Sequence, residues 1–202
     1  MPEHTPTTRR ATPEDVPALA RMLSRAFLDD PVAIWSCKPD DLRPKLLERF
    51  HAARLRQLLG EREVWTNPEL SSVALWAPPG RWKTTPREDL SLARPGLHPR
   101  LLARAPLVIA GLLGLERRHP RDPPHWYLAM LATDPDAQGQ GHGSAVLSPI
   151  LKQCDTDGVA AFLESSKERN IDFYARHGFQ VTHELRMPRG PKLWAMWRNP
   201  RP

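Results

Sequence analysis

Cysteine and tyrosine are rare in this chain, with two of each among 202 residues. Cys37 and Cys154 form no metal-binding spacing and are too few for a disulfide framework, which is typical of proteins in a reducing compartment. The eight histidines show no ligand spacing either, so we expect no bound metal. These absences predict a cytoplasmic protein.

Long hydrophobic runs are missing as well. The most apolar stretch, "APLVIAGLLGL" (Ala105–Leu115), is too short to cross a bilayer. The N-terminal stretch "MPEHTPTTRRATPEDV" is polar and has no apolar segment of a signal peptide. We therefore expect a soluble protein with no membrane partner.

Clusters of like charge are also lacking. The chain has 29 basic and 23 acidic residues, for a formal net charge of +6. The excess suits an anionic ligand, but no run of Arg or Lys is longer than two. This pattern indicates a solvated basic surface, and we expect no nucleic-acid partner.

The length and the absence of internal repeats predict one domain over residues 1–202, which is long enough for a full hydrophobic core. We expect residues 1–6 to form a flexible tail. The Pro- and Arg-rich segment 80–122 is poorly periodic, and we expect it to be a variable insertion of loops and short helices.

Hydrophobic periodicity predicts alternating strands and helices. In the first half we expect a short strand at 7–10, a helix that Thr12 caps and that ends near 29–31, a helix over 44–59, a hairpin from "EVWT" and "SSVALWA", and a helix over 101–115 bent at Pro106. In the second half we expect buried strands at 125–131 and 159–164, helices at 144–155 and 171–177, and final strands at 179–187 and 192–197.

One segment between the two buried strands is unusual. "DAQGQGHGSAV" (Asp136–Val146) has glycines at 139, 141 and 143 and then continues as a helix. Glycines let the backbone approach an anion closely, and the amides at a helix start point toward it. Gln138 can add a side-chain donor. The segment predicts a pyrophosphate site, although a glycine-rich turn that only starts a helix would look the same.

A dinucleotide-binding oxidoreductase is one candidate for this pattern. Gly139, Gly141 and Ser144 approximate the dinucleotide fingerprint, and Glu164 stands where a ribose-binding acid is expected. However, "TDPDA" separates the strand from the first glycine, and little chain remains for further βαβ units. These features disfavour this candidate.

A second candidate has two motifs in its favour. Gln138, Gly141 and Gly143 fit the pattern Gln/Arg-x-x-Gly-x-Gly/Ala, and "NIDFYARHGF" places Asn170 and Tyr174 ahead of a Gly-Phe pair. With these motifs the chain resembles the GNAT N-acetyltransferases, best over residues 126–197. "VALWAPP", "QGHGSAVL", "FLESS" and "GPKLWAMWR" are most similar to the branch of the family that acetylates aminonucleoside antibiotics and occurs in actinobacteria.

The resemblance implies an α/β fold whose mixed, mostly antiparallel twisted sheet is flanked by helices and splayed between its two central parallel strands to admit CoA. It implies acetyl-CoA as cosubstrate and a small-molecule primary amine as acceptor, acetylated by direct attack. A non-catalytic CoA-binding module of the same fold remains an alternative. Segment 80–122 would then lie on the acceptor side.

The resemblance also assigns roles to residues. Tyr174 would protonate the departing thiolate, although it could instead be a core aromatic. The residues expected at the cosubstrate are Leu131, Ala132, Thr133, Gln138, Gly139, Gln140, Gly141, His142, Gly143, Ser144, Asn170 and Tyr174. Asn170 could also cap its helix. Neither Cys154 nor Ser165 is needed as a nucleophile.

Glu164 is the candidate base, because an unpaired carboxylate at the end of a buried strand can take up a proton. It could equally be a structural acid bonded to backbone N–H groups, and Asp134, His125 and Asp30 are weaker alternatives. For the acceptor we expect contacts from Asp29, Asp30, Trp35 and Trp82, although "DDP" is also an ordinary helix stop.

Overall fold

The computed structural model describes residues 7–38, 40–60, 63–85, 92 and 98–201. The expected tail, residues 1–6, lies outside the described residues, and so does most of 86–97 within the expected insertion.

A seven-stranded sheet organises the chain, in the order β1-β2-β3-β4-β5-β7-β6. The strands are β1 (Arg9–Arg10), β2 (Val64–Thr66), β3 (Ser72–Ala77), β4 (His125–Thr133), β5 (Ala160–Ser165), β6 (Gln180–Arg186) and β7 (Lys192–Arg198). β4 and β5 pair in parallel, and every other neighbouring pair is antiparallel. This confirms the expected mixed, mostly antiparallel sheet. It makes a dinucleotide fold wrong, because that fold needs a mostly parallel sheet.

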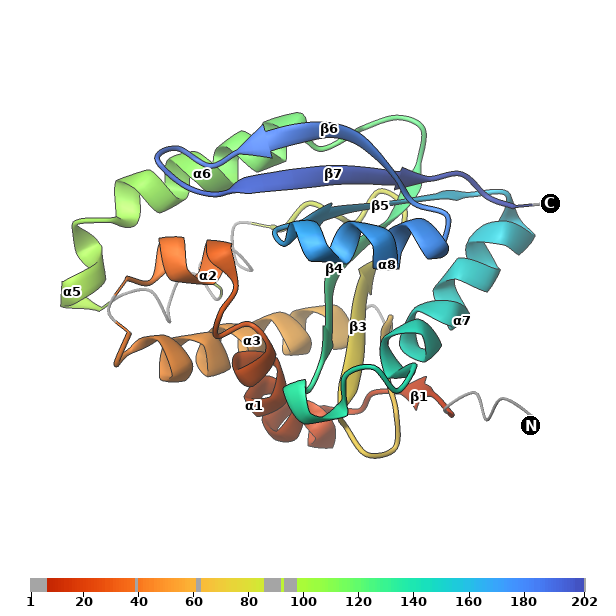
Figure 1. Ribbon diagram of the computed structural model, residues 1–202, viewed down its shortest axis with the longest axis horizontal. Coiled ribbons are helices and arrows are strands. Elements are labelled where there is room, and N and C mark those ends of the chain that lie inside the picture. Colours follow the sequence, from red (N-terminus) through yellow and green to blue (C-terminus); the bar gives the residue numbers. More distant parts are fainter. Residues whose placement is uncertain (1–6, 39, 61–62, 86–91, 93–97, 202) are drawn as a thin grey trace.

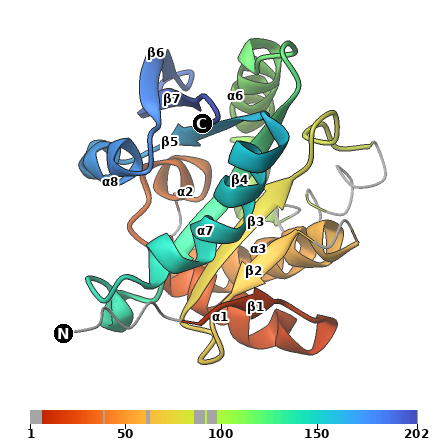
Figure 2. The same cartoon turned by 90° about the vertical axis from the view of Figure 1, so that its right-hand side faces the viewer.

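Helices cover both faces of the sheet (Figures 1 and 2). α1 (Val16–Ala26) and α3 (Arg43–Leu59) pack on β2, β3 and β4, while α2 (Pro31–Ser36) and α6 (Ala105–Arg118) pack on β5, β6 and β7. α7 (His142–Asp157) and α8 (Ile171–Arg176) pack on the opposite face. Strand alternation separates these cores: Phe162 points to the α2/α6 side, and its neighbour Leu163 points to the α7/α8 side.

Two expectations for helices are corrected. α2 was not expected, because "DDP" was interpreted only as the stop of the first helix. Asp30 in fact caps α2 by accepting from the N–H groups of Val32 and Ala33 at 2.9 and 3.1 Å, and Pro31 occupies the first helical position. The expected bent helix is instead two helices, α5 (Pro99–Leu102) and α6, with Pro106 in the first turn of α6.

The central parallel strands separate after four residue pairs, from His125–Ala160 to Leu128–Leu163. Just beyond this point β4 bulges: Trp76 faces Leu128 but Leu75 faces Met130, so Ala129 is an extra residue. From here β4 follows β3 and β5 follows β7. The expected splay is confirmed, and the bulge lies where it opens.

Across the described part of the chain, no helix has the length and apolar character needed to cross a membrane.

Candidate functional site

The splay between β4 and β5 opens into a cleft of about 530 Å³, which is within the usual range for a small-molecule site. Its walls are the end of α1, the open edges of β4 and β5, the start of α7, and the segment from β5 into α8. Nearly all residues expected at the cosubstrate lie here: Leu131, Ala132, Thr133, Gln138, Gly139, Gly141, His142, Gly143, Ser144, Asn170 and Tyr174. Gln140 is not in the lining.

The glycine segment forms the lower wall of this cleft. Gly139 and Gly141 have φ of +78° and +81°, a conformation that side-chain-bearing residues rarely adopt, and a Cβ at either would meet open space. Gly141 is the N-cap of α7, so the first N–H groups of that helix have no partner within the helix. These donors give the wall its capacity to bind an anion.

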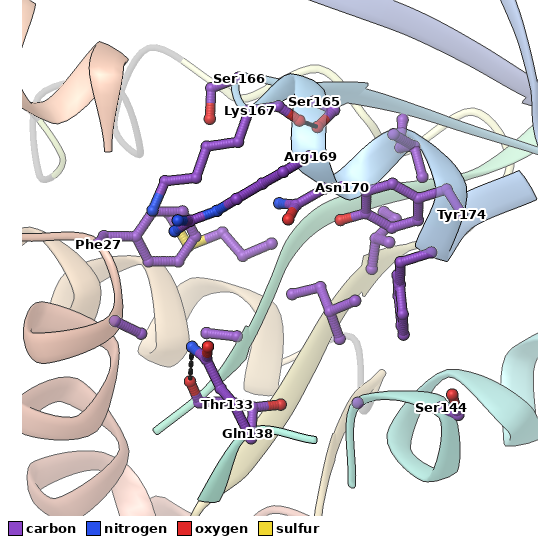
Figure 3. A pocket seen from close by; sticks show the side chains of 18 of the residues that line it. Phe27, Thr133, Gln138, Ser144, Ser165, Ser166, Lys167, Arg169, Asn170 and Tyr174 are labelled. Carbon is purple, nitrogen blue, oxygen red and sulfur yellow. Dashed lines mark hydrogen bonds between the residues drawn. The ribbon is translucent and has the colours of Figure 1, made fainter. Parts of the chain in front are cut away.

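Gln138 and Ser144 use their side chains locally. The Gln138 amide donates to the carbonyl of Thr133 at 3.3 Å (Figure 3), and the Ser144 hydroxyl lies 3.0 Å from Nε2 of His177. Asn170 stands at the N-cap position of α8 but makes no side-chain capping bond, so the expected cap is not present. Its side chain lies in the cleft beside Tyr174 (Figure 3).

The open edge of β4 supplies a second set of donors. Asp134 donates its N–H to the carbonyl of Ser71 at 2.7 Å, so the alternation of an antiparallel pair directs Ala132 toward β3. By the same alternation Leu131 and Thr133 direct their backbone groups away from β3. These groups face the side of the cleft, where β5 has already separated.

Tyr174 enters the cleft from α8, with its ring packed on Phe173 and Phe179 and its hydroxyl directed inward (Figure 3). No described group hydrogen-bonds to that hydroxyl, so it is available to a ligand. Burial, and after it the Asp30 carboxylate, raise the pKa of Tyr174 well above its ordinary value. The phenol is therefore a protonated donor at neutral pH.

Glu164 reaches the cleft from the opposite face of the sheet, because it has the same strand parity as Phe162. Its side chain is 9% exposed, and its Oε1 lies 3.8 Å from Nδ1 of His119. Tyr127 also faces it: burial and then the Glu164 carboxylate raise the pKa of the Tyr127 phenol. Glu164 thus has two side-chain neighbours, His119 and Tyr127.

The other candidate bases are placed differently. Asp134 is outside the lining and pairs with Arg25 at 3.1 Å, and His125, the first residue of β4, is buried and also outside the lining. Asp30 does line the cleft, but its carboxylate accepts from two N–H groups of α2 and from the Ser166 hydroxyl. These three hydrogen bonds commit the Asp30 carboxylate to the cap of α2 and to the contact with Ser166.

A cross-link, which we call the strap, spans the cleft near Asp30. It consists of Asp29 and Asp30 from the α1–α2 turn and Ser166, Lys167 and Arg169 from the segment after β5. Asp29 pairs with Lys167 at 2.5 Å and with Arg169 at 3.2 Å, while Asp30 accepts from Ser166. The Lys167 ammonium lowers the pKa of Asp29. Asp29 therefore anchors the strap and is not itself in the lining.

Neither tryptophan expected at the acceptor lines the cleft. Trp35 is 5% exposed, packs in the core with Met187 and Leu193, and donates from Nε1 to the carbonyl of Pro188 at 3.1 Å. Trp82 instead stacks on His119, with ring centroids 3.9 Å apart and planes 19° apart. The structure therefore places both tryptophans in packing contacts outside the lining of the cleft.

Several lining residues were missed. Phe27, Ser166, Lys167, Arg169, Phe173 and Arg176 all face the cleft. A helix pattern predicts Phe27 as core, and the charged residues looked like ordinary surface. Cys154, in contrast, is buried in the core under α7, and burial raises the pKa of its thiol to about 12, which leaves it unreactive.

Comparison with known proteins agrees with this geometry. A family model described as the acetyltransferase (GNAT) family matches residues 63–179. An uncharacterized N-acetyltransferase of Schizosaccharomyces pombe is 25% identical over 195 residues, which cover 90% of this chain and 77% of that protein.

Solved structures extend the likeness to the whole chain. A structure described as histone acetyltransferase HPA2 and related acetyltransferase, from Corynebacterium glutamicum, is 27% identical, has a TM-score of 0.64 and covers 98% of both chains. The polyamine N-acetyltransferase of Drosophila melanogaster is 12% identical, with a TM-score of 0.60 over 96% of this chain and 99% of that one, and shows a shared fold.

Proposed function

The chain belongs to the GNAT family of acetyltransferases and is an acyltransferase, and from this premise we propose that it transfers an acetyl group from acetyl-CoA to a small primary amine. One observation supports the proposal most. An acid, Tyr174, and a base, Glu164, approach the same splayed cleft from opposite faces of the sheet, where a thioester between them would meet both.

The residues of the cleft fit acetyl-CoA. Gly139 and Gly141 leave open space beside a helix start, which suits a pyrophosphate. The backbone groups of Leu131 and Thr133 along the open edge of β4 suit an extended amide-bearing arm. When bound there, acetyl-CoA supplies an activated thioester carbonyl.

The chain's own groups then have separate tasks. Glu164 takes a proton from the acceptor nitrogen, and backbone donors of β4 polarise the carbonyl. Tyr174 gives its proton to the leaving sulfur, and the second proton that the attacking nitrogen loses returns to the phenolate through water. Direct attack needs no nucleophile of the protein, in keeping with a buried, unreactive Cys154.

The acceptor is the finer part of the proposal. Drosophila polyamine N-acetyltransferase and a structurally similar agmatine N-acetyltransferase make small alkylamines candidates. The sequence segments that resemble the aminonucleoside branch make puromycin a second candidate, with antibiotic protection as the cellular readout. We expect the reaction in the cytoplasm, since both cysteines are free thiols.

A free-thiol release assay with acetyl-CoA tests the function across a panel of agmatine, spermidine, puromycin and a lysine-containing peptide. We expect amine-dependent thiol release with at least one small amine and a rise in melting temperature with CoA but not with NADH. A melting shift without release by any amine would support the non-catalytic CoA-binding module. The absence of both a melting shift with CoA and thiol release with any amine would refute the proposal.

A further inference from the structure

Beneath Glu164, on the side away from Tyr174, lies a closed group of aromatic and imidazole rings. His119 follows α6 and is 6% exposed, and His125 opens β4 and is 2% exposed. The His119 ring meets Tyr127 and Phe162 edge to face, at centroid distances of 4.8 and 4.9 Å. Imidazoles so enclosed have fixed orientations, and their protonation follows from their contacts.

The hydrogen bonds fix the tautomers of both rings. Nδ1 of His125 lies 2.9 Å from the carbonyl of Pro123, which can only accept, so Nδ1 carries a proton. Burial lowers the pKa of His125, which keeps the ring neutral and leaves Nε2 as an acceptor. His119, whose Nε2 is 3.1 Å from that atom, must then donate from Nε2.

This order of donors leaves Nδ1 of His119 with a lone pair directed at Glu164, 3.8 Å from Oε1. The carboxylate also presents lone pairs, so a proton delivered to either group can be passed to the other. The separation is somewhat longer than a direct hydrogen bond, as is common for catalytic contacts without substrate, and one water or a small rotation closes it.

Trp82 completes the arrangement by covering the face of His119 at a centroid distance of 3.9 Å. The face of an indole is negative and attracts a cation. Once His119 has received a proton, the Glu164 carboxylate lies at its edge and the indole of Trp82 lies over its face.

Resting on the proposed function, we propose that Glu164 and His119 act as one base, in which His119 is a positioning residue that holds the proton Glu164 removes and His125 sets its tautomer. The N–H bond of the acceptor ammonium breaks and its electron pair stays on nitrogen. The proton passes through the Glu164 carboxylate to Nδ1 of His119, and it leaves to water after the products depart.

Other titratable groups face this pair from the neighbouring elements. Tyr127 of β4 faces Glu164, and its raised pKa keeps it protonated. The positive charge of Arg54 in α3 partly offsets the rise in the pKa of Tyr127. In the loop that carries Trp82, Lys83 is paired with Glu116 of α6 at 2.8 Å. Among these described groups, His119 is the one with a lone pair directed at the carboxylate.

The first test is the pH dependence of kcat/KM in His119→Gln, whose amide can still donate to His125 but cannot take up a proton. We expect a loss of about 10²-fold for an alkylamine, which is ammonium at neutral pH, and a smaller loss for a weakly basic α-amino acceptor. The acidic limb should move to lower pH by about one unit or more, because a lone carboxyl titrates below an imidazole. His183→Gln, at an exposed site on β6, is the matched control and should change neither value.

The second test needs no turnover. In the free protein with ¹⁵N-labelled histidine, NMR should show His125 protonated at Nδ1 and His119 protonated at Nε2. Glu164→Gln should change the ¹⁵N chemical shift of His119 Nδ1, because an amide replaces the carboxylate that this nitrogen faces. Trp82→Leu should change that shift by a smaller amount.

These measurements separate the two proposals. A His119 Nδ1 chemical shift that does not respond to Glu164→Gln overturns the pairing, whatever the activity. A shift that does respond, in a protein that acetylates no amine, refutes the function and leaves the pairing. Equal loss for both acceptors with an unmoved acidic limb would make His119 a structural residue, and circular dichroism of each variant identifies loss of folding.

Discussion

The candidate acid and the candidate base of this protein lie on opposite faces of the sheet. Tyr174 and Glu164 are only ten positions apart, yet α8 brings one to the cleft from above and β5 brings the other from below. Both were singled out from the sequence, Tyr174 through a motif and Glu164 through its place at a strand end. His119 was not, because nothing in a linear sequence brings positions 82, 119, 125 and 164 together.

At this scale the sharpest prediction concerns Tyr174→Phe, which keeps the ring and removes the hydroxyl. We expect kcat to fall by ~10²–10⁴-fold, the usual contribution of a general acid. The affinity for acetyl-CoA should change little, because the proton is given only in the transition state. Steady-state kinetics and the CoA melting shift measure the two effects.

The outcome has a clear alternative. Near-normal kcat would make Tyr174 a packing residue of the core that it shares with Phe179. The substitution leaves no cavity, so we expect the variant to fold. Loss of folding would therefore also indicate a structural role for Tyr174.

Among the elements, α7 shows how sequence determines a site. It is bounded by two left-handed glycines, Gly141 with φ +81° and Gly158 with φ +67°, and a Cβ at either meets open space. The two ends have equal backbone demands, but only the first lines the cleft. A substitution at Gly158 is therefore a matched control for the same substitution at Gly141.

We predict that Gly141→Val and Gly158→Val each cost about 1–3 kcal/mol of unfolding free energy from backbone strain. Only Gly141→Val should abolish the rise in melting temperature with CoA, because its side chain enters the space beside the first amides of α7. Thermal melts with and without CoA measure both effects. A shift that survives in Gly141→Val would remove the pyrophosphate assignment.

Elements with strong local signals were predicted well, and those defined by contacts were not. The glycine loop, the β2–β3 hairpin and the parallel strands followed from turn chemistry and apolar runs. α2 was missed because Asp30 and Pro31 can end one helix and begin the next. The bulge at Ala129 has no sequence signal, since it depends on the register with β3. The acceptor side was least predictable, because Trp35 and Trp82 pack against residues far along the chain.

For the whole molecule, the burial of His51 in the core under α3 predicts a loss of stability in acid. His51 is 1% exposed, lies between Phe27 and Phe50, and has a pKa that burial lowers to about 3. The unfolded chain binds a proton there from about pH 6.5 downward, while the folded protein does not until about pH 3. Stability contributed by neutral His51 is thus lost as pH falls through this window.

We predict that His51→Leu flattens this dependence, so that the unfolding free energy falls by a few kcal/mol less between neutral pH and pH 3. Urea unfolding at several pH values measures it, with His183→Gln as an exposed control. Parallel curves for His51→Leu and the unchanged protein would assign the acid lability elsewhere.

The strap joins the α1–α2 turn to the segment after β5 by contacts that differ in their response to dissolved ions. Arg169 and Asp29 are 68% and 64% exposed, whereas the Lys167 side chain is 15% exposed and Asp30 is buried. Salt screens exposed charges over about 8 Å at physiological ionic strength and hardly affects buried hydrogen bonds. Rising ionic strength therefore loosens the outer edge of the strap first, while Asp30 still holds Ser166. The ionic strength of the surrounding solution thus determines how readily the two sides of the strap separate.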